Sequence, residues 1–149
     1  MSTSEINRPE SVCVSDIAYL GNRSNSSYLA LITDAYSKKI VGYNIKDILN
    51  VSGSLKALEM ALNNRVYKSR TLILHSDRGL QYCSNEYQKL LNINNIKPSM
   101  TEKYDPDENA IAERINGILK QEFEIVKHIS SFNIKKALIR NAIEIYNQK

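Results

Sequence analysis

Three β-strand patterns follow one another near the start of the chain, and only short connections separate them. Residues 12–20 (VCVSDIAYL), 27–33 (SYLALIT) and 39–45 (KIVGYNI) are rich in β-branched and other apolar side chains. The two connections are polar and have the composition of turns. Strands joined by such short turns pair in opposite directions, so this part of the chain predicts an antiparallel meander.

A fourth strand is expected at residues 71–75, where a short apolar run (LIL) is typical of a strand buried on both faces. A helix is predicted before it, over residues 52–65, with Ser52 or Ser54 as the capping residue. Because this strand is reached through a helix, we expect it to run parallel to residues 12–20 or to a neighbouring strand.

The rest of the chain continues the alternation of helix and strand. Ser84 is expected to begin a helix, residues 96–100 a fifth strand with Pro98 marking it as an edge, and residues 106–128 and 132–146 two further helices. The residues expected to face the core in these last two helices are Ile111, Ile115, Ile118, Leu119 and Val126, and Ala137, Leu138, Ile139, Ala142, Ile143 and Tyr146. The order predicts an α/β protein with the layout of the ribonuclease H fold, a mixed five-stranded sheet flanked by helices.

The totals indicate the domain organisation and the cell compartment. At 149 residues the chain suits one domain, and we expect a flexible arm over residues 1–11 before a folded domain over residues 12–149. The net charge of +4 suits a phosphate backbone as partner. Cys13 and Cys83 are expected to be buried thiols, since zinc-ligand spacing is absent. No apolar run approaches the roughly 20 residues of a membrane span, and no signal peptide is evident, so we expect a cytoplasmic protein without membrane contact.

Three carboxylates occupy positions that a fold of this kind brings together. Asp16 lies in the middle of the first strand, Asp77 follows the fourth strand, and Glu113 lies inside the helix that begins at Pro106. Each has an ordinary alternative: an edge-strand acid facing solvent, a turn cap, and a solvated helix residue paired with a neighbouring cation. Asp34 is a further acid at a strand end, but its sequence context favours a structural role in a turn.

Carboxylates on two strands and a helix are suited to Mg²⁺ or Mn²⁺, which prefer oxygen ligands. Two such ions, about 3.5–4 Å apart, can activate a nucleophile on one side of a phosphodiester and stabilise the leaving oxygen on the other. Asn116 and Lys120 follow Glu113 by three and seven residues, so they share its face on one continuous helix. Lys120 would then lie about 10 Å further along the helix axis.

The motifs resemble those of a known family. Thirty-five residues separate Asp77 from Glu113, and Lys120 follows. That spacing resembles the DD(35)E transposases and integrases. The segments DIAYL, YLALITDAYSKKIVGY, HSDRGLQYCS, PSMT and NAIAERINGILKQE resemble, more narrowly, the catalytic core of bacterial insertion-sequence transposases related to retroviral integrase. The resemblance covers nearly the whole chain, residues 7–147.

The resemblance implies a DDE polynucleotidyl transferase. It would cut DNA at transposon ends and join the 3′-hydroxyl to target DNA, with two Mg²⁺ or Mn²⁺ ions held by Asp16, Asp77 and Glu113. The partners would be the transposon ends, the target DNA and further copies of the chain in a homo-oligomer. The residues it places at the DNA are Lys120, Asn109, Gln81, His75 and Asn116.

For His75, a hydrogen-bonded histidine at a strand end is an equal alternative to a role at the DNA. Two other functions also remain open at this point: a ribonuclease H-like nuclease, and a non-catalytic remnant of a transposase that binds DNA or mediates assembly. The spacing of the acids and the presence of Lys120 argue against the first, and the presence of all three acids argues against the second. We expect recognition of the DNA ends to reside on another segment.

Overall fold

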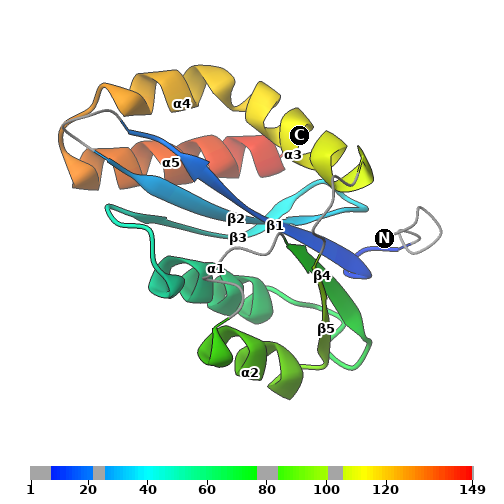
Figure 1. The fold of residues 1–149 in the computed structure, drawn as a ribbon. Coiled ribbons are helices and arrows are strands. Elements are labelled where there is room, and N and C mark those ends of the chain that lie inside the picture. Colours follow the sequence, from blue (N-terminus) through cyan, green and yellow to red (C-terminus); the bar gives the residue numbers. More distant parts are fainter. Residues whose placement is uncertain (1–7, 22–25, 77–83, 101–105, 149) are drawn as a thin grey trace.

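A computed structural model describes residues 8–21, 26–76, 84–100 and 106–148, without the side chains of residues 100, 106–110 and 112. Figure 1 shows its helices and strands. In chain order the elements are β1 (Val12–Tyr19), β2 (Tyr28–Asp34), β3 (Ile40–Lys46), α1 (Val51–Asn63), β4 (Leu72–Ser76), α2 (Asn85–Ile93), β5 (Ile96–Met100), α3 (Pro106–Ile118), α4 (Lys120–Lys127) and α5 (Phe132–Asn147). None of the helices in these ranges is both long and apolar enough to cross a membrane.

The five strands form one mixed sheet in the order β3-β2-β1-β4-β5. β1, β2 and β3 pair antiparallel, as the short turns predict, and β4 pairs parallel with both β1 and β5. The parallel register of β1 and β4 runs from Val12 opposite Ile73 to Val14 opposite His75. The predicted meander, the parallel fourth strand and the edge position of the fifth strand are therefore confirmed.

Helices cover both faces of the sheet (Figure 1). α1 and α2 lie on one face, and α3, α4 and α5 lie on the other. Successive side chains of a strand point to opposite faces. In β1, Val14 and Ala18 accordingly pack beneath the second group of helices, and Cys13 and Ile17 pack against the first. β1 thus contributes to both apolar layers.

The predicted N-cap of α1 is wrong, and the predicted N-cap of α2 is confirmed. Asn50, not Ser52 or Ser54, caps α1: its Oδ1 accepts hydrogen bonds from the Ser52 backbone N at 3.0 Å and from the Ser52 Oγ at 2.7 Å. The prediction was wrong because the helix begins at Val51, which leaves Ser54 inside it and buried. Ser84 caps α2 as predicted, accepting a hydrogen bond from the Tyr87 N.

The helix predicted over residues 106–128 is divided in two. α3 ends at Ile118 and α4 begins at Lys120, with Leu119 at the junction. The junction closely follows Gly117, and a glycine weakens a helix by about 0.5–1 kcal/mol relative to alanine. Leu119 and Val126 are buried as expected, whereas Ile118 is 43% exposed, so its predicted place in the core is wrong.

The buried face of α5 includes Ile139, Ala142 and Ile143, as predicted, but it differs at other positions. Ala137 and Leu138 are exposed, and the fully buried Lys135 lies four residues before Ile139 on the inward face. The Lys135 Nζ donates a hydrogen bond of 2.9 Å to the Ser27 Oγ, and burial lowers the pKa of Lys135. A polar side chain can take a core position in this way when a partner offsets part of its desolvation.

Removing only the Ser27 hydroxyl should lower the free energy of unfolding more than removing both the hydroxyl and the Lys135 ammonium. Ser27→Ala leaves the buried ammonium without the hydroxyl, so we expect a loss of about 1.5–3 kcal/mol in the free energy of unfolding at pH 7. Ser27→Ala together with Lys135→Met replaces both groups by apolar ones and should recover most of that loss. Urea unfolding of the two variants measures the difference.

The pH dependence provides the control for this pair. Because the folded pKa of Lys135 lies below the unfolded one, the unfolded chain binds its proton more tightly. Wild-type stability should therefore rise as the pH increases from the folded pKa towards the unfolded pKa of about 10.4. The double variant should lack this rise. Equal pH profiles for both proteins would contradict the assignment of a buried, charged Lys135.

Replacement by alanine should change the stability of the protein in opposite directions at Gly42 and Gly117. A Cβ added at Gly42 on β3 would lie 2.2 Å from the Ala57 carbonyl oxygen of α1, whereas one added at Gly117 meets no atom within 4 Å. Gly42→Ala should destabilise by about 1–3 kcal/mol because α1 must shift away from the sheet. Gly117→Ala should stabilise by about 0.5–1 kcal/mol because it strengthens the helix. Thermal unfolding tests both, and equal effects would contradict the close packing of α1 on β3.

Candidate active site

Asp16 lies on the central strand of the sheet. β1 runs between β2 and β4, which excludes the alternative of an edge-strand acid. The half-buried Asp16 shares its face with Val14 and Ala18 and pairs in register with Leu31, and Val14 and Leu31 are both only 3% exposed. A carboxylate among such neighbours is costly unless other groups or a cation compensate its charge.

Helix α3 covers the same face of β1. Ile111 is buried in one cluster with Val12 and Val14, and Ile115 is buried in the next cluster, against which Ala18 packs. Glu113 lies between these two isoleucines in the sequence and has an exposed side chain. At about 100° per residue it projects away from the face that Ile111 and Ile115 bury. The fold therefore brings the helix of Glu113 to the strand of Asp16, with the Glu113 carboxylate on the solvent side.

The third expected acid, Asp77, lies outside the described residues, as does Gln81. Within the described ranges, no three His, Cys, Asp or Glu side chains are grouped closely enough to hold a metal ion. Asn109 belongs to α3, but its side chain is also outside the described part. The three-carboxylate site and these two DNA contacts stay predictions.

His75, one of the residues that the resemblance places at the DNA, is buried in the core. Its side chain is 2% exposed, and its Nδ1 lies 2.9 Å from the Ser99 Oγ of β5. This is the hydrogen-bonded strand-end histidine that the sequence left open as an alternative. The structure favours that role over direct contact with DNA.

Asn116 and Lys120 line one hollow of about 290 Å³ beside the end of β1. Lys120 begins α4, whereas Glu113 lies on α3. The prediction that both residues share one continuous helix is therefore wrong. Helical hydrogen bonds nevertheless span the junction, from the Leu119 N to the Ile115 carbonyl at 3.0 Å and from the Phe123 N to the Leu119 carbonyl at 2.9 Å. The two polar residues therefore remain close to each other at the surface.

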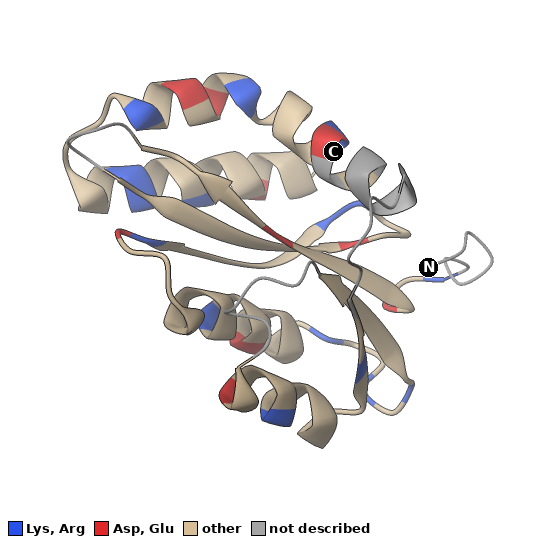
Figure 2. Cartoon of the chain, in the orientation of Figure 1, with Lys and Arg blue, Asp and Glu red and all other residues tan. Residues whose placement is uncertain are grey.

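The two lysines that line this hollow differ in their ion pairing. Figure 2 shows basic and acidic positions interspersed along α4. Lys127, which also lines the hollow, pairs with Glu124 at 3.1 Å. Lys120 is exposed and forms no ion pair with any residue in the described ranges. An exposed, uncompensated ammonium is suited to a phosphate group.

Asp34 has the structural role that its sequence context predicted. It is 3% exposed, and its carboxylate accepts hydrogen bonds from the Ser37 Oγ at 2.8 Å and from the backbone N atoms of Glu10, Tyr36 and Ser37 at 3.2–3.4 Å. Cys13 is buried as expected, and burial raises the pKa of its thiol, so the thiol stays neutral. Cys83 lies outside the described residues.

One group of contacts was missed by the sequence reasoning. The Glu10 carboxylate accepts hydrogen bonds from the Val66 N and the Tyr67 N and lies 3.7 Å from the Arg65 Nε. Residues 8–11, the end of the arm expected to be flexible, are therefore held against the loop that follows α1. Nothing in the local sequence signals a contact across more than fifty positions.

The described architecture and the sequence together define the class of protein. The chain belongs to the integrase core domain family: one family profile matches residues 6–106, and a second integrase core domain profile matches residues 94–149. Together with the transposase relatives described next, these matches confirm the predicted resemblance to insertion-sequence transposase cores. The spacing between Asp77 and Glu113 as a functional feature stays a prediction.

Individual relatives narrow the class. Transposase InsF for insertion sequence IS3A of Escherichia coli (strain K12) is 35% identical over 141 residues, which are 94% of this chain and 49% of that protein. The transposase InsF for insertion sequence IS3 of Escherichia coli O111:H- matches to the same extent. The chain spans about half the length of these relatives.

Solved structures support the fold. The HTLV-2 integrase catalytic core domain, in a dimeric form in complex with magnesium, has a TM-score of 0.68 at 18% identity and covers 91% of this chain and 84% of its own. The catalytic core domain of BIV integrase has a TM-score of 0.64 at 16% identity, with 89% and 80% covered. The ribonuclease H-like fold predicted from the order of elements is confirmed.

Proposed function

We propose that this chain is the catalytic core of a DNA transposase, which cleaves DNA at transposon ends and joins the 3′-hydroxyl to target DNA. The observation that carries the proposal is the placement of Asp16. It is a half-buried carboxylate on the central strand, on the face covered by the helix that bears Glu113, in a chain of the integrase core domain family.

The proposal places Asp77 beside Asp16. In the described part of the parallel pair, Val14 lies opposite His75. Two further residues along the same register would bring Asp77 opposite Asp16, and paired residues in register point to the same face of a sheet. Asp77 would then share the face of Asp16 that α3 covers.

Asp16, Asp77 and Glu113 would hold the Mg²⁺ or Mn²⁺ ions. The donors fit such cations, because all three are carboxylates and an acid among apolar neighbours gains most from a bound positive charge. Two bound divalent ions would activate the attacking hydroxyl and stabilise the leaving oxygen of the phosphodiester. The protein's own part is to fix the carboxylates on a rigid sheet and an adjoining helix.

Lys120 and Asn116 would hold the DNA beside the metal site. They line the same hollow, and Lys120 has no ion-pair partner in the described ranges. A lysine at a phosphate adds affinity that is independent of sequence and sensitive to salt. We also propose a homo-oligomer, supported by the HTLV-2 integrase cores, whose solved structures are described as dimeric and trimeric forms.

Asp16→Asn should abolish activity without loss of stability. The substitution keeps the shape of the side chain but removes the negative charge, so Mn²⁺-dependent nicking of DNA should disappear. Without metal, the Tm should stay unchanged or rise, because the substitution removes the cost of keeping a negative charge among apolar neighbours. The increase in Tm that Mn²⁺ produces in the wild type should also be lost, because only a bound metal stabilises the folded chain.

Asp34→Asn is the matched control. It loses a buried carboxylate that accepts several hydrogen bonds, so the Tm should fall, by the equivalent of about 1.5–3 kcal/mol, while the Mn²⁺-induced increase in Tm remains. A large loss of stability in Asp16→Asn would indicate a structural role for Asp16. Normal DNA binding by the wild type without nicking would support the non-catalytic remnant instead.

Lys120→Ala should affect DNA binding and leave the metal site intact. We expect weaker binding to all DNA sequences and a decrease of about one unit in the slope of log affinity against log salt. Mn²⁺ binding should be unchanged. The control is Lys89→Ala, on α2 at the opposite face of the sheet, which should leave the slope unchanged. An unaltered slope in Lys120→Ala would assign Lys120 to the solvated surface.

A further inference from the structure

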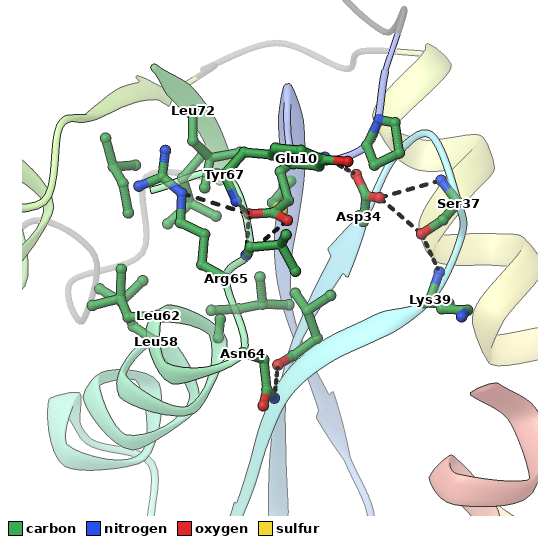
Figure 3. A pocket seen from close by; sticks show the side chains of 18 residues that line it. Glu10, Asp34, Ser37, Lys39, Leu58, Leu62, Asn64, Arg65, Tyr67 and Leu72 are labelled. Atoms are coloured by element: carbon green, nitrogen blue, oxygen red, sulfur yellow. Dashed lines mark hydrogen bonds and ion pairs between the residues drawn. The ribbon is translucent and has the colours of Figure 1, made fainter. Parts of the chain in front are cut away.

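A second cavity lies on the face of the sheet opposite to Asp16. Its volume is about 440 Å³, and it is enclosed by β1, β2, α1 and the loop that leads from α1 to β4 (Figure 3). Six of its lining residues are buried members of the apolar core beneath α1 and α2; they are Cys13, Ile32, Leu58, Leu72, Leu74 and Ile96. A volume of this size is typical of pockets that hold small organic molecules.

The two acidic side chains that line the pocket, Glu10 and Asp34, already have hydrogen-bond partners within the protein. Asp34 accepts the four hydrogen bonds described above, and the Glu10 carboxylate accepts those of two backbone N–H groups and lies beside Arg65. Figure 3 shows both carboxylates turned towards these partners. Neither acid therefore needs a cation from a ligand.

Arg65 is likewise committed to the protein. Its side chain is 4% exposed, one terminal nitrogen donates to the Asn94 carbonyl at 2.9 Å, and the other donates to the Arg70 carbonyl. Its Nε faces Glu10. Arg65 joins the loop after α1 to the end of α2, and it is not available to bind an anion.

Lys39 is the charged group that remains. It lines the mouth of the pocket and is exposed, and within the described part of the chain its ammonium forms no hydrogen bond or ion pair. The Cys13 thiol at the floor is neutral at physiological pH, because burial raises its pKa. The pocket thus combines an apolar interior with an unpaired ammonium among its described lining residues.

We propose that this pocket binds a small amphipathic acid. The apolar body would lie against Leu58 and Leu72, and a single carboxylate at the entrance would pair with Lys39. The exposed side chains of Val66 and Tyr67 at the mouth, 74% and 43% accessible, would extend the apolar contact. Glu10 and Asp34 disfavour ligands with several negative charges, such as nucleotides or a DNA backbone. The site is therefore chemically distinct from the proposed DNA surface.

Titration calorimetry with octanoate and with neutral 1-octanol tests the proposal on the full chain. Wild type should bind both, and octanoate about 1.5- to fivefold more tightly, the range expected for one exposed ion pair. Lys39→Gln should remove this preference and leave octanol binding unchanged. Lys68→Gln, an exposed lysine outside the lining of the pocket, should leave both affinities unchanged. Failure of the wild type to bind either compound, or an undiminished preference in Lys39→Gln, would overturn the proposal.

The location of the ligand needs a second measurement. In methyl NMR spectra, octanoate should shift the signals of Leu58 and Leu72 and leave those of Leu119 and Val126, on the opposite face, unmoved. Leu62→Trp, which adds bulk at the side of the pocket formed by α1, should abolish binding of both compounds. Shifts confined to Leu119 and Val126 would place the ligand elsewhere and refute the site. None of these results depends on the transposase activity.

Discussion

The pairing of β1 on both of its sides holds the two halves of the sheet together. β1 joins the antiparallel meander to the parallel half of the sheet, and its alternating side chains enter both apolar layers. A shift of the register by one residue would exchange these two sets of side chains. Asp16 would then leave the face that α3 covers, and Cys13 would leave the floor of the opposite pocket.

The same alternation separates two kinds of chemistry. Asp16 faces the helices that carry Glu113 and Lys120, where we propose that metal ions and phosphate bind. Cys13 faces α1 and α2, where the walls are apolar and the buried acids are satisfied by the protein itself. A thin sheet can thus hold a polar site and an apolar pocket on opposite faces of one strand.

The parts that the sequence predicted correctly are those specified by local pattern. Apolar runs and turn composition locate the strands, and the order of elements then limits the topology to a few arrangements. The burial of Lys135 and the contact of Glu10 with the loop after α1 were missed because distant packing decides them. The break at Leu119 follows Gly117, a local signal that the predicted continuous helix did not take into account. In the candidate site, the sequence proposed three acids by type and spacing, which stay predictions, and the sheet showed that Asp16 is central and half-buried.

Diffraction from crystals soaked in Mn²⁺ would show where the metal binds, because the anomalous signal of the metal locates it independently of any assumption about ligands. We expect anomalous density between the carboxylates of Asp16 and Asp77, with Glu113 completing the site from α3. Absence of metal there at saturating Mn²⁺, or Asp16 and Asp77 on opposite faces of the sheet, would contradict the proposed metal site.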